Sequence, residues 1–312
     1  MILALAGGVG GAKLAAGLAR ALPPGELVVA VNTGDDFAHL GLHVSPDLDT
    51  VMYTLAGIAN PATGWGQAGE TWNFMEALGR LGGPAWFRLG DRDLATHAER
   101  TRRLAAGETL SQATRALCER LGVRHAVVPM SDAQVRTVLH TDRGVLEFQH
   151  YFVRERCEPR VSRIEYRGAA EATPSAAFAA ALESASLRGI VLCPSNPFLS
   201  VQPILAVPGV RAAIMRCPRV LAVSPIVAGQ AVKGPAAKLM QELGMQADAA
   251  EVARFYRGVV RTMMIDRADA SLAPEIESLG LRVVVEDTMM RDDAGRERVA
   301  RACLAQLEAM PT

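Results

Sequence analysis

Short apolar runs recur along the chain between stretches of helical periodicity. Each run is about five residues long, and the alternation of such runs with helices is typical of βαβ units. The predicted strands are 2–6, 27–31, 125–129, 189–193, 219–223 and 282–286. The predicted helices are 11–21, 68–81, 93–105, 110–121, 175–185, 235–244 and 295–308.

The predicted strands are continuously apolar rather than alternating, which indicates that both faces of the sheet are covered. We therefore expect an α/β fold, Rossmann-like, with a mostly parallel sheet flanked by helices. Residues 137–153, TVLHTDRGVLEFQHYFV, differ because they alternate around a TDRG turn, and the strand-like VSRIEYRG follows. This pattern predicts a smaller helical and β-hairpin subdomain, with an antiparallel hairpin insertion near 134–168, in a single domain spanning 1–312.

Charge and cysteine content narrow the classes of partner. The 312 residues include 33 basic and 33 acidic ones, so no global field favours nucleic acid or an anionic membrane. The five cysteines are scattered and lack metal-binding spacing, which favours a reduced, cytoplasmic compartment. The N-terminal apolar run has no basic residue before it and is broken by glycines, unlike a signal peptide. No other stretch has about 18 uninterrupted apolar residues, so we expect no membrane span.

The segment ALAGGVGGAKLAAGLA follows the first predicted strand and opens a helix. Gly8, Gly10 and Gly11, with Lys13 in the first helical turn, are typical of a phosphate site built from backbone amides and the positive helix end. Leu14 stands where a Walker A loop needs Ser or Thr, and the GxGxxG pattern is incomplete. The alternative is that the glycines only allow the helix to pack closely on the sheet.

Four aspartates lie within residues 32–50, NTGDDFAHLGLHVSPDLDT, a segment without lysine or arginine. Asp35 and Asp36 follow the second predicted strand, at the sheet edge that also carries the glycine turn. Carboxylates beside a phosphate repel it unless a divalent cation lies between them, so we predict Mg²⁺ with these two ligands. The SPDLDT segment also predicts a helix start, which leaves Asp47 and Asp49 open as helix-start residues or ligands.

Two further loops carry candidate binding residues. RLGDRDLATH contains Arg88 and Arg92, which either contact a phosphate or an aromatic substrate or belong to a self-neutralising surface loop. CPSNPFLSVQPI holds Ser195 and Asn196 between two prolines, in a rigid loop suited to a nucleobase or phosphate.

A last segment, AVSPIVAGQAVKGPAAKLM, carries Lys233 and Lys238 and indicates either a second phosphate-facing loop or an ordinary one. The six histidines show no zinc pattern, and no serine stands in a GxSxG elbow. Covalent catalysis is therefore not supported.

Several long motifs together resemble one known family. They are LAGGVGGAKLAAGL, VNTGDDF, SPDLDTVMYTLAG, ETWNF, WFRLGDRDLATH, VPMSD, CPSNPFLSVQPIL and SPIVAGQAVKGPAAKLM. In order and spacing from Leu3 to about Met240, and more diffusely to Asp287-Thr288, the chain resembles the 2-phospho-L-lactate transferase family of coenzyme F-420 biosynthesis. The resemblance implies transfer of a phospho-acyl unit from a guanosine-diphospho-linked donor to the ribityl hydroxyl of the deazaflavin FO, with release of GMP. It also implies Mg²⁺ dependence and a homodimer.

The resemblance also assigns roles to individual residues. The donor diphosphate would be held by the glycine turn, that is Gly8, Gly10, Gly11 and Lys13. Mg²⁺ would reach its oxygens through Asp35 and Asp36, and the nucleoside part of the donor would contact Ser195 and Asn196. The deazaflavin would contact Asp49 and either Arg88 or Arg92. Asp49 would also orient or deprotonate the attacking hydroxyl, although an ordinary aspartate is a weak base at neutral pH.

Two other classes of protein remain as alternatives. A related group of regulatory proteins shares the glycine turn and binds nucleotide-sugars without known turnover, but lacks the NTGDD and SPDLDT motifs in this form. A nicotinamide dehydrogenase is disfavoured because Asn32, not an acid, ends the second strand. Phospholactate, phosphoenolpyruvate and phosphoglycerate remain equally open as the acid of the donor.

Overall fold

The computed structural model describes residues 1–232 and 234–311 and is built around a seven-stranded sheet, in which every pairing is parallel. The strand order is β14-β13-β10-β9-β1-β2-β5. These strands are β1 Ile2–Ala6, β2 Leu27–Val31, β5 Ala126–Pro129, β9 Gly189–Leu192, β10 Val220–Val223, β13 Thr262–Asp266 and β14 Arg282–Glu286. The predicted parallel α/β fold is confirmed.

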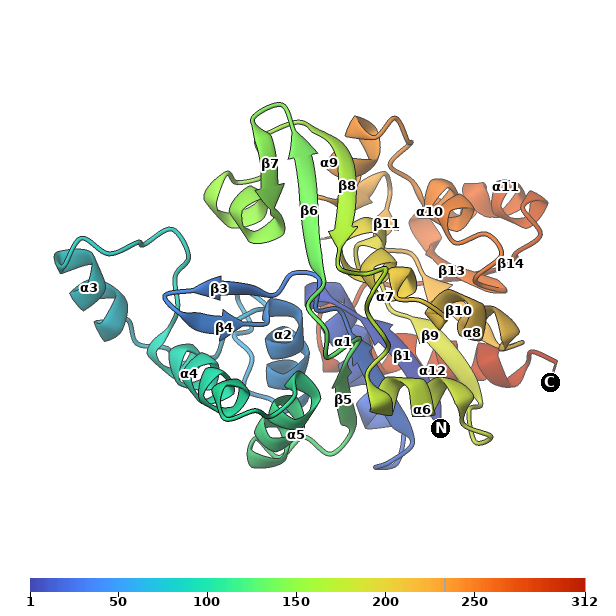
Figure 1. Cartoon of the computed structure of the whole chain (residues 1–312). Coiled ribbons are helices and arrows are strands. Elements are labelled where there is room, and N and C mark those ends of the chain that lie inside the picture. The colour runs from blue at the N-terminus through green and yellow to red at the C-terminus, as the bar shows by residue number, and fades with distance from the viewer. Residues whose placement is uncertain (233, 312) are drawn as a thin grey trace.

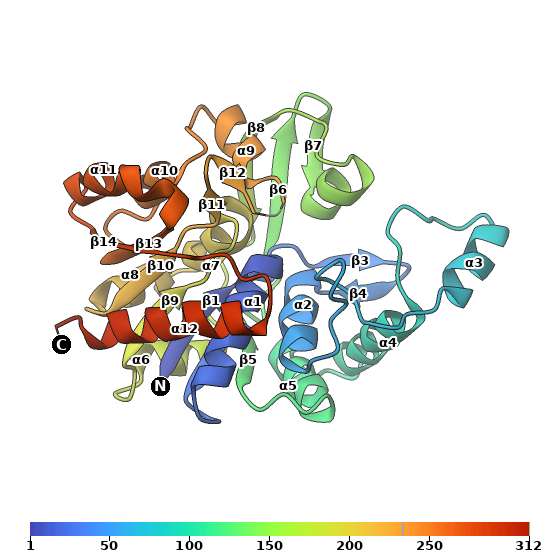
Figure 2. The ribbon, with the colours of Figure 1, turned by 180° about the vertical axis from the view of Figure 1, so that it is seen from behind.

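Helices cover both faces of this sheet (Figures 1 and 2). One face is covered by α1 Gly8–Ala21, α2 Pro46–Leu55, α5 Leu110–Arg120 and α12 Asp293–Glu308. The other is covered by α6 Ala176–Glu183, α7 Gln202–Ala206, α8 Val210–Arg216, α9 Ala236–Glu242, α10 Ala249–Phe255 and α11 Ala273–Ser278. Beyond the sheet, α3 Asn73–Arg80 and α4 Asp91–Ala105 extend to one side, where α3 projects from the body of the molecule.

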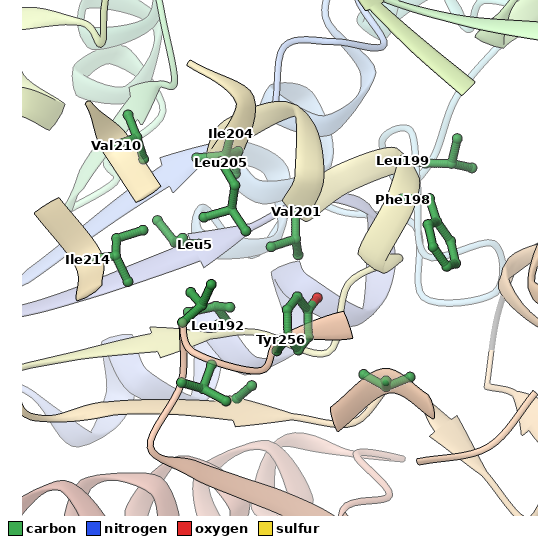
Figure 3. Close-up of a cluster of buried hydrophobic side chains, with 14 of the residues drawn as sticks. Leu5, Leu192, Phe198, Leu199, Val201, Ile204, Leu205, Val210, Ile214 and Tyr256 are labelled. Carbon is green, nitrogen blue, oxygen red and sulfur yellow. The ribbon is translucent and has the colours of Figure 1, made fainter. Parts of the chain in front are cut away.

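The central strand β1 shows why the strands of the main sheet are continuously apolar in sequence. All five of its residues are buried, and they alternate between two cores. Leu3 and Leu5 point into one core, whereas Ile2, Ala4 and Ala6 point into the other. In Figure 3, Leu5 lies in the first core near side chains of α7, α8 and the segment that contains Tyr256. Burial on both faces removes the alternation that a half-exposed strand would show.

The predicted hairpin insertion is present as a second, antiparallel sheet. Strands β6 Arg136–Thr141 and β7 Gly144–Glu147 pair across a two-residue turn, and β8 Val161–Arg167 pairs with the other edge of β6. A short π-helix, η1 His150–Arg154, follows β7. The small sheet stands beyond the edge of the main sheet (Figure 1). The description of the chain as one domain remains a prediction.

Local geometry explains where the predicted elements differ from the observed ones. The predicted helix 68–81 shortens to α3, because Gly69 has a φ of +67°, which a right-handed helix does not allow. Strand β13, TMMID, begins with a threonine and ends with an acid, so it is not an uninterrupted apolar run, and it was not predicted. A small antiparallel hairpin, β3 Phe37–His39 and β4 Leu42–Val44, also went unpredicted.

All five cysteines are free. Among the described residues, no single helix has the length and apolar composition needed to cross a membrane. The two neighbouring helical stretches Pro197–Ala206 and Val210–Arg216 would meet that test only together, and they are bent by 92° relative to one another.

Candidate functional site

The chain changes direction across the sheet between β1 and β9. Strands β1, β2 and β5 extend to one side, and β9, β10, β13 and β14 extend to the other. In open α/β sheets, ligands bind beyond the carboxyl ends of the strands at such a switch point. The loops that follow β1 and β9 meet there, which brings the predicted glycine turn beside the predicted Ser195-Asn196 loop.

The glycine turn is in close contact with this second loop. The Gly7 amide donates to Ser195 Oγ at 3.0 Å, and that hydroxyl donates to the Gly7 carbonyl at 2.9 Å. A Cβ on Gly10 would lie 2.2 Å from the Pro194 carbonyl oxygen, and one on Gly11 would lie 2.5 Å from Ser195 Oγ. The close-packing role of these glycines is therefore real, and phosphate binding is a further role that stays a prediction.

Two amides connect the glycine turn and the acidic segment: the backbone amide of Gly8 and the side-chain amide of Asn32. Gly8, whose φ of +59° suits glycine, donates its amide to Asp47 Oδ1 at 2.7 Å. Asn32 Nδ2 donates to Asp47 Oδ2 and to Asp35 Oδ1, both at 2.9 Å. Two carboxyl groups in the interior thus share one side-chain amide.

These two carboxyl groups carry perturbed pKa values. Burial raises the pKa of Asp35 well above its ordinary value, and the neighbouring charge of Asp47 raises it further. Burial also raises the pKa of Asp47 to about 6, although the hydrogen bonds from Asn32 and Gly8 act in the opposite direction. Two like charges in a buried place are costly, and a bound divalent cation would relieve that cost.

Asp36, the other predicted metal ligand, lies in a different environment. Its Oδ2 accepts from Ser45 Oγ at 2.8 Å and lies 3.1 Å from His43 Nε2. Its Oδ1 is buried and has no hydrogen-bond partner among the described residues. That oxygen remains available to a cation, whereas Oδ2 serves to hold the start of α2.

Asp49 belongs to a buried ion pair. Both of its oxygens accept from the Arg100 guanidinium, through Oδ2 at 3.1 Å and through a shorter contact at Oδ1. Arg100 is fully buried; burial opposes its charge, but the Asp49 carboxylate raises its pKa. Asp49 is therefore more than a helix-start residue, because it compensates the charge of a buried arginine.

Asp49 also belongs to a set of side chains with metal-binding composition. Ligand atoms of Asp49, Asp93 and His97 lie within 4.8 Å of one another. The guanidinium of Arg100 contacts both Asp49 and His97, and its positive charge disfavours a cation at the same place. The Asp35 and Asp47 pair is the better candidate metal centre.

A cavity of about 400 Å³ opens at this edge of the sheet. The predicted site residues that line it are Gly8, Gly10, Lys13, Asp35, Asp49, Arg88, Ser195 and Asn196, and Asp47 lines it as well. Three other predicted residues that the structure describes, Gly11, Asp36 and Arg92, are not in its lining. The structure thus brings most of the predicted site together.

One wall of the cavity is apolar and largely aromatic. Phe148 and Phe152, from the end of β7 and the π-helix after it, stack at 5.3 Å between ring centroids, and both line the cavity. Phe87 and Trp65 contribute from the long segment between α2 and α4. Phe152 and Trp65 are partly exposed, as expected for side chains at an open mouth. A flat aromatic ligand would find contact area here.

The two candidate arginines differ in their surroundings. Arg88 lines the cavity and lies 4.3 Å above the Trp72 ring. Arg92 donates to the Ala68 carbonyl at 2.9 Å, on the exposed outer side. The geometry favours Arg88 as a contact of a ligand in the cavity.

The Ser195-Asn196 loop begins a short π-helix, η2 Pro197–Val201. Asn196 Oδ1 caps it by accepting from the amides of Phe198 and Leu199 at 3.0 and 3.2 Å. Asn196 Nδ2 is buried and has no partner among the described residues, so it is a donor available to a ligand. Ser195 instead uses its hydroxyl to hold the glycine turn.

The segment after β10 carries two lysines, and a second phosphate-facing loop was one interpretation of its sequence. Lys233 lies outside the described residues. Lys238 donates to Glu242 Oε1 at 2.5 Å and to the Pro159 carbonyl at 3.0 Å, so its charge is already paired where α9 meets the segment before β8.

A parallel sheet with a ligand cavity at its switch point defines an α/β protein of the Rossmann-like class. Its lining of carboxylates and available donors is that of an enzyme site rather than of a packed core. The chain belongs to the 2-phospho-L-lactate transferase CofD family, whose model matches residues 2–302. It is therefore a member of a transferase family.

Relatives and solved structures agree with this assignment. A phosphoenolpyruvate transferase of Streptomyces griseus is 42% identical over 98% of both chains. A 2-phospho-L-lactate transferase of Methanothermobacter thermautotrophicus is 37% identical over 98% of both. A crystal structure of a UPF0052 family protein from Bacillus halodurans has a TM-score of 0.62 at 14% identity and covers 97% of this chain and 98% of that one, which supports the fold.

Sequence reasoning missed three residues of the site. Asn32 was noted only as the absence of an acid, although it joins Asp35 to Asp47. Arg100 and Tyr53 were not singled out, yet both are fully buried polar side chains. A charged residue on the inner face of a helix was the available signal for Arg100, since Asp93, His97 and Arg100 share one face of α4.

Proposed function

We propose that the protein moves a phospho-acyl unit from a guanosine-diphospho-linked donor to the ribityl hydroxyl of the deazaflavin FO, releasing GMP, in coenzyme F-420 biosynthesis. The observation that carries this proposal is the composition of the cavity. A glycine turn, buried carboxylates and an aromatic wall line the same space, as two substrates of different polarity require.

The donor diphosphate would lie at the start of α1, against the glycine turn and Lys13. The Asp47 carboxylate already accepts the Gly8 amide, in keeping with a helix end that favours an anion, and a divalent cation would be needed between this carboxylate and the diphosphate. The buried Nδ2 of Asn196 would donate to the nucleoside part of the donor.

Mg²⁺ fits the carboxylates beside this turn. Asp35 and Asp36 were predicted as its ligands, and Asp47 joins them as a candidate because it shares Asn32 with Asp35. The raised pKa of Asp35 and that of Asp47 are expected where two carboxylates await a cation. When bound, Mg²⁺ would neutralise charge on the diphosphate oxygens.

The acceptor would occupy the aromatic side of the cavity, with Arg88 at its edge. Its hydroxyl oxygen would attack the phosphorus that carries the acid, forming a P–O bond while the bond to GMP breaks and the hydroxyl proton passes to solvent water. Asp49 would accept a hydrogen bond from that hydroxyl and orient it. Positioning of this kind supplies much of the rate in phosphoryl transfer.

The test is incubation with FO, Mg²⁺ and GTP, together with each phospho-acid and its activating guanylyltransferase. Phospholactate, phosphoenolpyruvate and phosphoglycerate are compared by product mass and GMP release. We expect one acid to be preferred, and the names of the relatives make phosphoenolpyruvate and phospholactate the first choices. Failure of all three acids would exclude the transferase. Light scattering on the same sample tests the expected homodimer.

A further inference from the structure

The inner face of α4 carries three ionisable side chains one or two turns apart. Asp93, His97 and Arg100 are all buried, and Arg100 is the largest fully buried side chain of the described chain. Asp93 and His97 line the cavity, as does Asp49 of α2, whereas Arg100 lies behind them and is not in the lining. Arg100 would therefore act on a ligand only through its neighbours.

Arg100 contacts two of these neighbours with the same side chain. Its Nη1 and Nη2 donate to the two oxygens of Asp49, so that carboxylate has little freedom to rotate. The same Nη1 lies 3.3 Å from His97 Nδ1.

The contact with His97 favours a proton on one ring nitrogen over the other. A guanidinium has five N–H donors and no acceptor, so a nitrogen facing it must accept. His97 Nδ1 also lies 3.6 Å from Asp49 Oδ2, which is longer than its 3.3 Å contact with Arg100, so the Arg100 contact favours an unprotonated Nδ1 with the proton on Nε2. Nε2 lies 3.4 Å from Asp93 Oδ1 but forms no hydrogen bond with any described residue. Asp93 Oδ1 already accepts from the Tyr53 hydroxyl at 2.7 Å.

We propose that Arg100 is a positioning residue that fixes both the orientation of Asp49 and the Nε2–H tautomer of His97. The cavity wall then presents one acceptor, Asp49, and one donor, His97 Nε2–H, which Asp93 Oδ1 approaches only to 3.4 Å. Such a pair suits a hydroxyl-bearing ligand, which donates to the first and accepts from the second.

The role of this pair in turnover rests on the proposed function, in which the acceptor hydroxyl binds beside Asp49. The fixed wall would hold that hydroxyl in line with the donor phosphorus. Misplacement of reacting groups by about 1 Å can lower a rate about 100-fold, so a small shift of Asp49 would be sufficient.

The first measurement is the ¹⁵N NMR spectrum of the His97 ring in the full chain at pH 7.5, assigned by comparison with His97→Gln. We expect an Nε2–H tautomer in the wild type. A proton on Nδ1 would overturn the proposal. In Arg100→Lys, which keeps the buried charge and thus favours folding, we expect the Nδ1 signal to move toward that of a protonated nitrogen. An unchanged signal would also contradict it.

The second measurement is the steady-state kinetics of Arg100→Lys. We expect kcat to fall by about 10- to 100-fold while KM for the donor stays within about threefold, because only the acceptor side is disturbed. Arg102→Lys is the matched control on α4, since Arg102 is largely exposed and pairs with Glu99. Its kcat and its KM for the donor should equal those of the wild type. An unchanged kcat for Arg100→Lys would refute the positioning role.

The two measurements separate this inference from the proposed function. If the wild type is inactive with every donor, the proposed function fails, but the tautomer of His97 and its response to Arg100→Lys still decide the role of Arg100.

Discussion

Replacing Gly10 by alanine tests how closely the glycine turn approaches the loop after β9. A Cβ at this position would lie 2.2 Å from the Pro194 carbonyl oxygen, more than 1 Å inside the ordinary contact range that begins at 3.4 Å. That oxygen is backbone, and the next residue, Ser195, is tied to Gly7 by two hydrogen bonds, so it cannot move away easily. Overpacking of this kind costs about 1–3 kcal/mol.

Alanine also brings a gain that must be separated from this cost. In a helix, alanine is favoured over glycine by up to about 1 kcal/mol. A Cβ on Gly79 of α3 would meet no atom within 4 Å beyond its own stretch of helix, so this glycine offers the matched control. We expect Gly79→Ala to be neutral or stabilising and Gly10→Ala to destabilise by a net ~1–2 kcal/mol, which is roughly 2–3 °C in Tm for a chain of this size.

The assay is thermal and urea unfolding of both variants, with calorimetric titration of GDP. We expect Gly10→Ala to bind GDP more weakly, because the displaced loop also carries Asn196. If Gly10→Ala unfolds at or above the wild-type temperature, the glycine turn does not approach the Pro194 carbonyl closely. If it is destabilised yet binds GDP normally, the turn is a packing device and not the diphosphate site.

Three further predictions concern the charged residues of the cavity. Asp35→Asn should abolish turnover and leave the circular dichroism spectrum unchanged; an unaltered rate at limiting Mg²⁺ would count against its role as a ligand. Because the pKa of Asp47 is raised to about 6 in the folded state, its contribution to stability is present at low pH and is lost as the pH rises through that value. Without Mg²⁺, the free energy of unfolding should therefore be larger at pH 5 than at pH 8, by about 1.5 kcal/mol from this group, because about half of its effect is already lost below pH 5. Urea unfolding of Asp47→Asn should not show this part of the pH dependence. Arg88→Ala should raise KM for the acceptor about tenfold, whereas Arg92→Ala should change it less than twofold; the reverse order in steady-state kinetics would assign the contact to Arg92.

The strands show what the sequence could and could not predict about the fold. β1 is five apolar residues followed by glycines, so its type and its end are visible without any neighbour. β13 is a strand chiefly because β10 and β14 lie on either side of it, since Thr262, two methionines, Ile265 and Asp266 do not form a distinctive run. The local sequence pattern is enough to predict β1, whereas β13 depends on its pairing with neighbouring strands.

The candidate site divides in a similar way. The rule that ligands bind at the carboxyl ends of parallel strands was enough to bring Asp35, the glycine turn and Asn196 together. Arg100 could not be found in this way, because its partner Asp49 is 51 positions away and on another helix. A buried arginine becomes interpretable only once the group that compensates its charge is known.

The hydrogen bonds between Gly7 and Ser195 join positions 188 residues apart. Neither half of the chain contains a complete cavity, because the carboxylates come from the first third and the loop that faces them comes from the second half of the sheet. Closing loops of this length makes folding slower than it is for a chain with mostly local contacts. A chain that has not yet joined β1 to β9 would therefore lack part of the cavity wall, and ligand binding there would report that the two halves of the sheet have come together.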